Sequence, residues 1–127
     1  MIVLLVDGDL GFTFWLSQLL ASVGHTVIPA SSPENALDLL GALDVALDLV
    51  IIDFALAGAK ELVDSLRACA FPVNVMALVD SDEPRDRLPA SWRPDGFYSR
   101  PSEMDARTNR HWLSLIQSAL PAPAAVS

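Results

Sequence analysis

Residues 3–9 have the sequence Val3-Leu4-Leu5-Val6-Asp7-Gly8-Asp9. An uninterrupted apolar run followed by acids is typical of a strand buried on both faces, as strands of parallel sheets are. A second run, Leu47-Asp48-Leu49-Val50-Ile51-Ile52, shows the same arrangement and is followed by Asp53. Ligands of open parallel sheets bind at the carboxyl ends of the strands. The acids Asp7, Asp9 and Asp53 therefore predict an acidic site at that edge.

Apolar residues recur at helical spacing from Leu10 to Val23 and predict the first helix. Asp9 is placed as its N-cap, and Gly24 as its C-terminal stop. Phe14 falls on the side opposite the apolar stripe, where it would form an exposed patch with Leu10.

Strands and helices alternate along the rest of the chain. Further strands are expected at residues 25–28, 73–79 and 96–99. Further helices are expected from residue 33, over about residues 59–69, and after Pro101, from about Asp105 to near Leu120. The second helix is expected to turn Ala36, Leu37, Leu39, Leu40 and Leu43 inward. Between residues 83 and 94, three prolines limit any helix to short pieces, since an internal proline costs about 3 kcal/mol or more.

This alternation predicts an α/β fold with right-handed crossovers. We expect a doubly wound (βα)5 flavodoxin-like fold, in which a five-stranded parallel sheet in order 2-1-3-4-5 has helices on both faces. The order brings Asp7 and Asp53 side by side. Residues 1–120 are expected to form one domain, and residues 121–127 a tail or linker rich in proline and alanine.

Composition narrows the class of protein. The hydrophobic fraction of 52% is too high for a disordered chain. No apolar run approaches the roughly 18 residues that cross a bilayer, and no signal peptide precedes the first strand, so no membrane association is expected. Cys69, the single cysteine, cannot form an internal disulfide. These features predict a cytoplasmic protein.

The net charge of −8 argues against direct binding of nucleic acid. Residues 1–84 hold twelve acids and two bases, a balance of −10, whereas residues 85–127 hold six arginines and four acids, a balance of +2. The mixed charge of the 85–110 region predicts a partner surface, either for a homodimer or for an acidic protein, with a solvated face as the plain alternative.

Three motifs in this order resemble the receiver domain of two-component signal transduction. They are residues 3–9, residues 48–53 and Gly96-Phe97-Tyr98-Ser99-Arg100-Pro101, and the resemblance covers about residues 2–120. It implies a response regulator of a phosphorelay, with Asp53 as phosphoacceptor, Mg²⁺ held by Asp7 and Asp53, and a histidine kinase or other signalling protein as partner. No enzyme activity is implied beyond an autocatalytic phosphoacceptor.

The sequence departs from the family at the positions that carry its chemistry. Gly8 replaces the second acid of the acidic pair. Ala77 falls where the family has a hydroxyl that contacts the phosphoryl group, and Arg100 falls where it has lysine. Phe97 occupies the aromatic switch position, and Ala57 stands where proline is usual.

Three interpretations follow from the resemblance and its departures. In the first, the chain is a degenerate pseudo-receiver that acts through protein–protein interaction with weak or no phosphorylation. In the second, it is a conventional receiver phosphorylated on Asp53 with Mg²⁺ by a histidine kinase. In the third, it is an unrelated sheet protein. Within the first two, Asp9 either replaces the missing metal ligand or only caps its helix. Arg100 either neutralises a phosphoryl group or pairs with Asp53 or Asp7. Any Mg²⁺ site is expected to be weak.

Overall fold

The apolar runs form the strands of one parallel sheet. A computed structural model describes residues 1–42, 46–68, 73–79, 96–98, 101, 103 and 105–119. The elements are β1 (Ile2–Val6), α1 (Leu10–Ser22), β2 (Thr26–Ala30), α2 (Pro33–Ala42), β3 (Leu49–Asp53), α3 (Ala59–Arg67), β4 (Asn74–Leu78), β5 (Gly96–Tyr98) and α4 (Ala106–Ala119).

The sheet has five strands in the order β2-β1-β3-β4-β5, and every neighbouring pair is parallel. The predicted sheet order is therefore confirmed. The second strand begins at Thr26 and continues to Ala30, two residues beyond its expected end.

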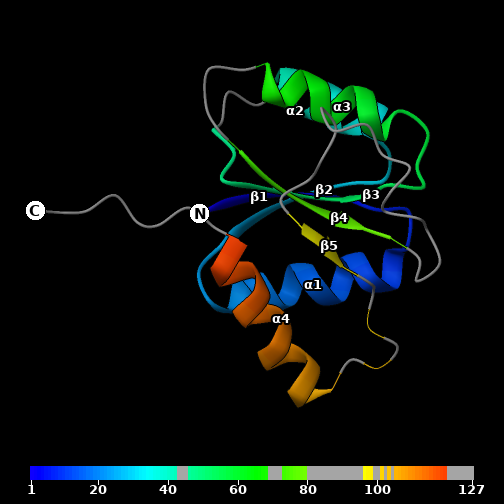
Figure 1. Cartoon of the computed structure of the whole chain (residues 1–127). Helices are drawn as coiled ribbons and strands as arrows, with labels where there is room; N and C mark the ends of the chain where they lie inside the picture. Colours follow the sequence, from blue (N-terminus) through cyan, green and yellow to red (C-terminus); the bar gives the residue numbers. More distant parts are fainter. Residues whose placement is uncertain are drawn as a thin grey trace, which may run out of the picture.

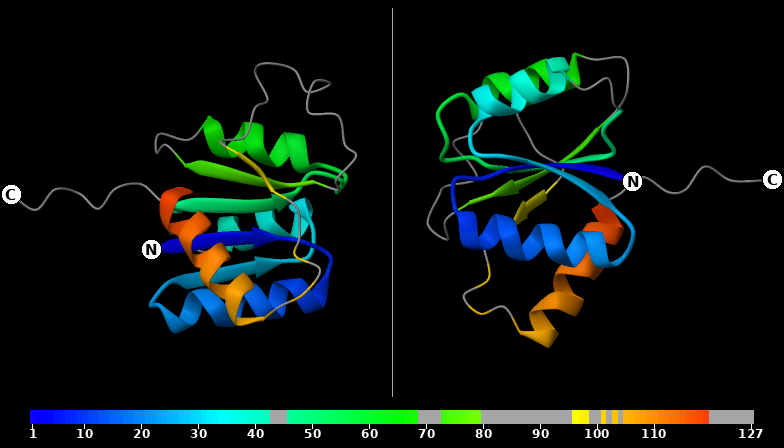
Figure 2. Two further views of the ribbon diagram at one scale, coloured as in Figure 1. Left: turned by 60° about the horizontal axis from the view of Figure 1, so that its bottom comes forward. Right: turned by 180° about the vertical axis from the view of Figure 1, so that it is seen from behind.

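Helices cover both faces of the sheet, as expected. Figure 1 shows α2 and α3 on one side and α1 and α4 on the other, and the two views of Figure 2 agree. Alternate residues of each strand supply the two cores. In β1, Leu4 and Val6 pack beneath α2 and α3, while Val3 and Leu5 pack against α1 and α4. The strands are apolar throughout because both faces are buried.

Helix α1 lies along one face of the sheet, and its sequence contains no charged residue. Its N-cap is Asp9, whose carboxylate accepts the backbone N–H of Phe12 over 3.1 Å, and it stops before Gly24, where φ is +91°. Leu10 and Phe14 are 77% and 69% exposed. The predicted cap, stop and exposed apolar pair are all confirmed.

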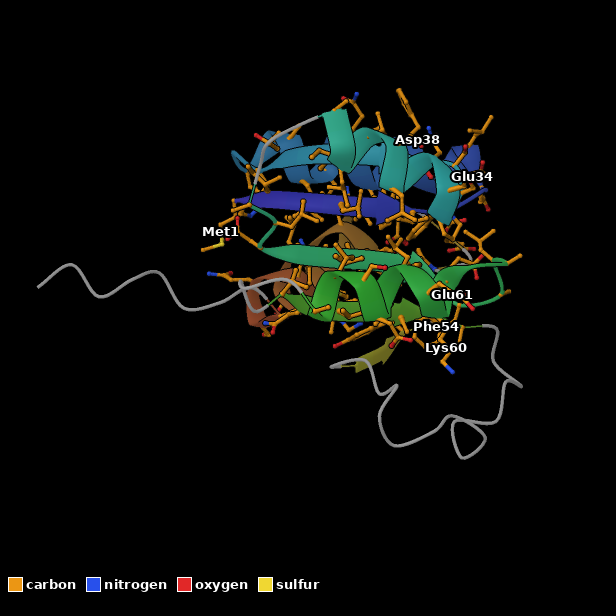
Figure 3. All side chains as sticks on the ribbon, turned by 90° about the horizontal axis from the view of Figure 1, so that it is seen from above. Met1, Glu34, Asp38, Phe54, Lys60 and Glu61 are labelled. Carbon is orange, nitrogen blue, oxygen red and sulfur yellow. The ribbon has the colours of Figure 1, made fainter. Side chains whose placement is uncertain are left out.

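Helix α2 differs from its prediction at one position. Leu37 is 45% exposed, so its expected inward orientation is wrong. Ala36 is the residue that takes the central buried place, and the next position turns by about 100° toward solvent. The outer surface of α2 and α3 is mainly acidic, and Figure 3 shows Glu34, Asp38 and Glu61 there, beside Lys60.

Several predictions concern residues outside the described ranges. They are the short helical pieces between residues 83 and 94, the inward position of Leu43, the thiol Cys69, the charge of Arg100 and the tail at residues 121–127. Of the helices in the described ranges, none has the length and apolar character required to cross a bilayer.

Candidate functional site

The two predicted site carboxylates follow paired residues of neighbouring strands. Val6 of β1 is in register with Ile52 of β3, and each strand continues into its acid, Asp7 or Asp53. Strand β1 lies between β2 and β3, and the connections that leave β1 and β3 separate at this edge. The predicted placement of Asp7 and Asp53 at the switch point of the sheet is confirmed.

Asp7 is buried, with 1% of its surface exposed, and it is the sole buried charged residue in the part of the chain that the structure describes. Its Oδ1 accepts the backbone N–H of Asp9 over 2.9 Å. Its own N–H donates to the carbonyl of Ala30, which extends the pairing of β1 with β2 beyond the strand. A carboxylate removed from water is costly unless it is hydrogen-bonded or near a cation, so this environment favours a functional role.

Asp53 is half-buried at the end of β3. Its Oδ1 accepts the backbone N–H of Ala55 over 2.9 Å, an Asx-type turn that begins the loop toward α3. Gly58 ends this loop with φ at +87°, a left-handed conformation that glycine adopts without strain. Backbone amides thus fix one oxygen of each site carboxylate, and this positions both side chains.

Asp9 acts as the helix cap. Its Oδ1 is engaged by Phe12, as described for α1. Within the described residues, no three carboxylate, imidazole or thiol side chains lie together so that they could hold a metal ion. A metal-ligand role of Asp9 stays a prediction.

The remaining donors could hold Mg²⁺. Mg²⁺ is commonly held by one or two carboxylates and keeps several waters, and Asp7 and Asp53 supply that number. Gly8 supplies no ligand. It is exposed, and a Cβ placed on it would meet only the carbonyl oxygen of Ser31, at 3.9 Å. A Cβ at this position therefore has room beside Ser31.

Ala77 lies one level deeper in the sheet than the two carboxylates. It is completely buried and is in register with Ile52 and Phe97, whereas Asp53 is in register with Leu78. A hydroxyl at Ala77 would therefore point into the core that packs against α2 and α3 rather than toward the rim.

Val79 lies on the same face of the sheet as Ala77, at the edge where the strands end. Alternate residues share a face, so Val79 follows Ala77 on that face, and its N–H still pairs with the carbonyl of Tyr98 over 2.9 Å. Like Ala77, Val79 has no hydroxyl.

The fifth strand brings Phe97 beside Ala77, as the backbone pairing shows. Arg100, expected near the carboxylates, falls outside the described residues, so its pairing with Asp53 or Asp7 stays a prediction.

Several solved structures that share this fold are response regulators or their receiver domains. The chemotaxis response regulator CheY4 of Vibrio cholerae gives a TM-score of 0.74 at 21% identity, over 94% of this chain and 98% of that one. The response regulator TrrA of Thermotoga maritima, in complex with Mg²⁺ and BeF, gives 0.72 at 21% identity, over 94% and 98%. A receiver protein from Burkholderia phymatum gives 0.71 at 22% identity, over 97% and 98%. No protein-family model and no curated protein matches the sequence. The chain thus has the receiver fold.

Proposed function

We propose that this chain is a receiver domain of a two-component response regulator that acts through protein–protein contact, with weak or no phosphorylation of Asp53. The observation that carries the proposal is the composition of the strand-end pocket. Asp7 and Asp53 are present on adjacent strands, but Gly8 contributes no third carboxylate, and neither Ala77 nor Val79 contributes a hydroxyl.

The charge and the hydrogen-bond donors of the pocket disfavour phosphorylation of Asp53. Phosphoryl transfer depends on positioning and on neutralising the charge of the transferred group, and the metal supplies much of both. A site with two carboxylates instead of three holds Mg²⁺ less tightly, because each carboxylate contributes charge and one ligand. Without a hydroxyl on the rim, a phosphoryl oxygen also lacks a hydrogen-bond donor from β4. Both losses disfavour the phosphorylated state.

One observation favours the alternative, a conventional receiver phosphorylated on Asp53 by a histidine kinase. Asp7 is buried and held by a backbone amide, and Asp53 stands beside it, so the acceptor and one ligand are built as in a working site. The Thermotoga maritima neighbour was solved with Mg²⁺ and BeF. The two alternatives differ in rate and not in the residue modified.

The deciding experiment is intact-mass analysis after incubation with acetyl phosphate and Mg²⁺, with Asp53→Asn as control. We expect little added phosphate over the time in which a conventional receiver saturates. Rapid, near-complete modification that Asp53→Asn abolishes would establish the conventional alternative.

A matched pair of variants tests the reason for the weakness. Gly8→Asp should strengthen Mg²⁺ binding, because its carboxylate enters open space beside Asp7. Gly41→Asp adds the same charge on the exposed surface of α2, where a Cβ meets nothing within 4 Å, and should leave Mg²⁺ binding unchanged. Equal effects of the two substitutions would show that net charge, rather than the pocket, controls metal binding.

The partner of such a domain would be a histidine kinase or another signalling protein, or a second copy in a homodimer. Of the basic residues in the 85–110 region, Arg107 and Arg110 lie in the described part of the chain, and both are exposed on α4. Exposed ion pairs contribute only about 0–1 kcal/mol each, so this surface would direct association more than it would strengthen it.

A further inference from the structure

We propose that the cavity between β5 and α4 binds a small planar aromatic carboxylate. The cavity has a volume of about 490 Å³, within the range of roughly 300–1,000 Å³ typical of small-molecule sites. Its residues come from the end of β5, from Pro101 and from α4. It is separate from Asp7 and Asp53, so the proposal does not depend on the function proposed above.

The apolar part of the cavity consists of Tyr98, Pro101, Trp112 and Leu115. The Tyr98 and Trp112 rings lie 6.5 Å apart between centroids, at an interplanar angle of 53°. Tyr98 and Pro101 offer flat surfaces that suit a ring, with Trp112, which is 3% exposed, beneath them, because aromatic pairs gain about 0.5–1.5 kcal/mol beyond the area that they bury. The walls therefore favour a planar aromatic body over a flexible aliphatic one.

The Trp112 wall is fixed from behind. Its indole packs edge-on against Phe12, with centroids 5.6 Å apart, and against Trp15, with centroids 6.0 Å apart. Trp15 is itself tied to α4, since its Nε1–H donates to Asn109 over 2.9 Å. A wall held on two sides loses little side-chain entropy when a ligand binds, and such preorganisation increases affinity.

The polar part of the cavity is basic. Arg107, Thr108 and His111 line it, and α4 contains no acidic residue between Ala106 and Ala119. No ion pair joins Arg107 to another described residue. The planar guanidinium can bind a carboxylate through two parallel N–H donors. In a chain with a net charge of −8, this lining selects an anion.

The acid nearest in sequence, Asp105, is already engaged. Its Oδ1 accepts the N–H of Thr108 over 2.9 Å, and the Thr108 hydroxyl also donates to it, which lowers its pKa. Asp105 caps α4, and the Thr108 hydroxyl serves that cap. Arg107 and His111 are the groups left to receive the ligand's carboxylate.

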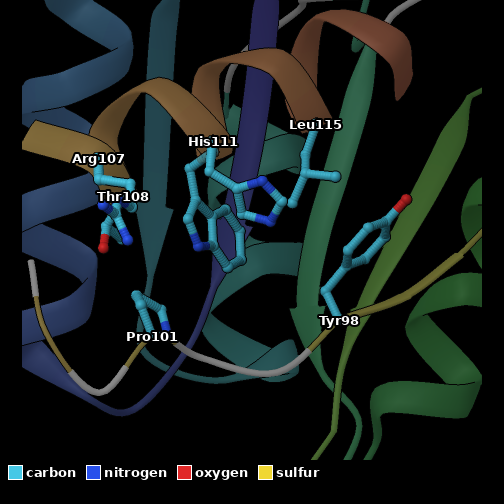
Figure 4. Close-up of a pocket in the computed structure, with 7 residues that line it drawn as sticks. Tyr98, Pro101, Arg107, Thr108, His111 and Leu115 are labelled. Atoms are coloured by element: carbon cyan, nitrogen blue, oxygen red, sulfur yellow. The ribbon is translucent and has the colours of Figure 1, made fainter.

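The arrangement also gives the ligand an orientation. Figure 4 shows Arg107 and Tyr98 at opposite ends of the cavity, with His111 between them and Leu115 on the Tyr98 side. Arg107, His111 and Leu115 are spaced four residues apart and so follow one stripe of α4. The carboxylate would bind at the Arg107 end, and the ring would pack toward Tyr98 and Leu115.

Isothermal titration calorimetry with indole-3-acetate tests the proposal, and the neutral indole-3-acetamide provides the charge control. We expect the acetate to bind and the acetamide to bind up to about fivefold more weakly, as loss of one exposed ion pair implies. Arg107→Gln should weaken acetate binding by a similar factor. Arg110→Gln, on the same helix but outside the cavity lining, should leave it unchanged.

Three results would overturn the proposal. They are no heat of binding with the wild-type chain, equal affinity for acetate and acetamide, and equal weakening by Arg107→Gln and Arg110→Gln. Both arginines are exposed, so neither substitution threatens the fold, and circular dichroism confirms this for each variant. If a peptide that carries the same indole binds much more tightly than the free acid, the cavity is a site for a protein partner instead.

Discussion

The backbone N–H of Asp9 donates to the carboxylate of Asp7 over 2.9 Å, while the carboxylate of Asp9 accepts the N–H of Phe12 over 3.1 Å. One residue therefore both orients the buried site carboxylate and begins α1. The first interaction uses only the Asp9 backbone, so substitutions of its side chain affect the cap without removing the hydrogen bond to Asp7.

Asp9→Ala should lower the free energy of unfolding by about 1 kcal/mol, through loss of the N-cap, and should leave Mg²⁺ affinity nearly unchanged. Urea unfolding and Mg²⁺ titration measure the two quantities. Asp9→Ser, which retains a capping oxygen, should recover most of the stability. If Asp9→Ser keeps the stability but abolishes Mg²⁺ binding, Asp9 is a metal ligand after all.

Val79→Thr should be tolerated and Ala77→Thr should not. The side chain of Val79 is half-buried on the rim and similar in shape to threonine, whereas Ala77 is fully buried and its replacement adds both bulk and a hydroxyl to a packed core. We expect Ala77→Thr to cost about 1–3 kcal/mol in urea unfolding.

The same two variants test which position contacts a phosphoryl group. In a Gly8→Asp background, Val79→Thr should increase modification of Asp53 by acetyl phosphate more than Ala77→Thr does. The opposite ranking would show that Ala77, as first expected from the sequence, is the functional position.

His25 should make the chain less stable as the pH falls below about 6.5. Partial burial and the neighbouring amino terminus lower the His25 pKa from 6.5, while Asp48 opposes the shift. Just below that pH the unfolded chain binds more protons, so the free energy of unfolding decreases as the pH falls. Urea unfolding at about pH 7.5 and about pH 5.5 measures this. His25→Gln should reduce the difference, and an equal difference in the wild-type and His25→Gln proteins would refute the assignment.

The Trp15–Asn109 hydrogen bond should couple α1 to α4. Trp15→Phe and Asn109→Ala should show an interaction energy of about 0.5–1.5 kcal/mol in a double-mutant cycle measured by urea unfolding. Ser114→Ala, at an exposed position of α4, serves as the control for Asn109→Ala. Additive effects of the Trp15 and Asn109 substitutions would show that this bond contributes nothing measurable.

Association of the chain should depend on the arginines of α4. Charge reversal at Arg107 and Arg110 should weaken self-association in a salt-sensitive way, observable by light scattering, because exposed charges are screened by ions. Phe14→Ser serves as the comparison, since Phe14 is 69% exposed and its removal should not disturb the fold. If Phe14→Ser abolishes association while charge reversal leaves it intact, the outer face of α1 is the contact surface.

Sequence reasoning succeeded where one local rule controlled the structure. The strands were predictable because burial on both faces leaves uninterrupted apolar runs, and the position of Asp7 beside Asp53 followed from the sheet order. The Asp9 cap was predictable because capping uses only neighbouring residues.

It failed where the answer depended on contacts between elements. The exposure of Leu37 depends on how α2 rotates against the sheet. The cavity beside α4 was also unforeseen, because Tyr98, Arg107 and Trp112 meet only after β5 and α4 pack.

The open space around Gly8 has an evolutionary consequence. Glycine and aspartate codons differ by a single base, and no side chain has filled the space that a carboxylate would need, since the nearest atom to an added Cβ is the Ser31 carbonyl oxygen at 3.9 Å. A lineage carrying this chain could therefore gain an acid at position 8 in one mutational step without compensating changes in the core. Selection, rather than a structural barrier, would have to keep position 8 as glycine.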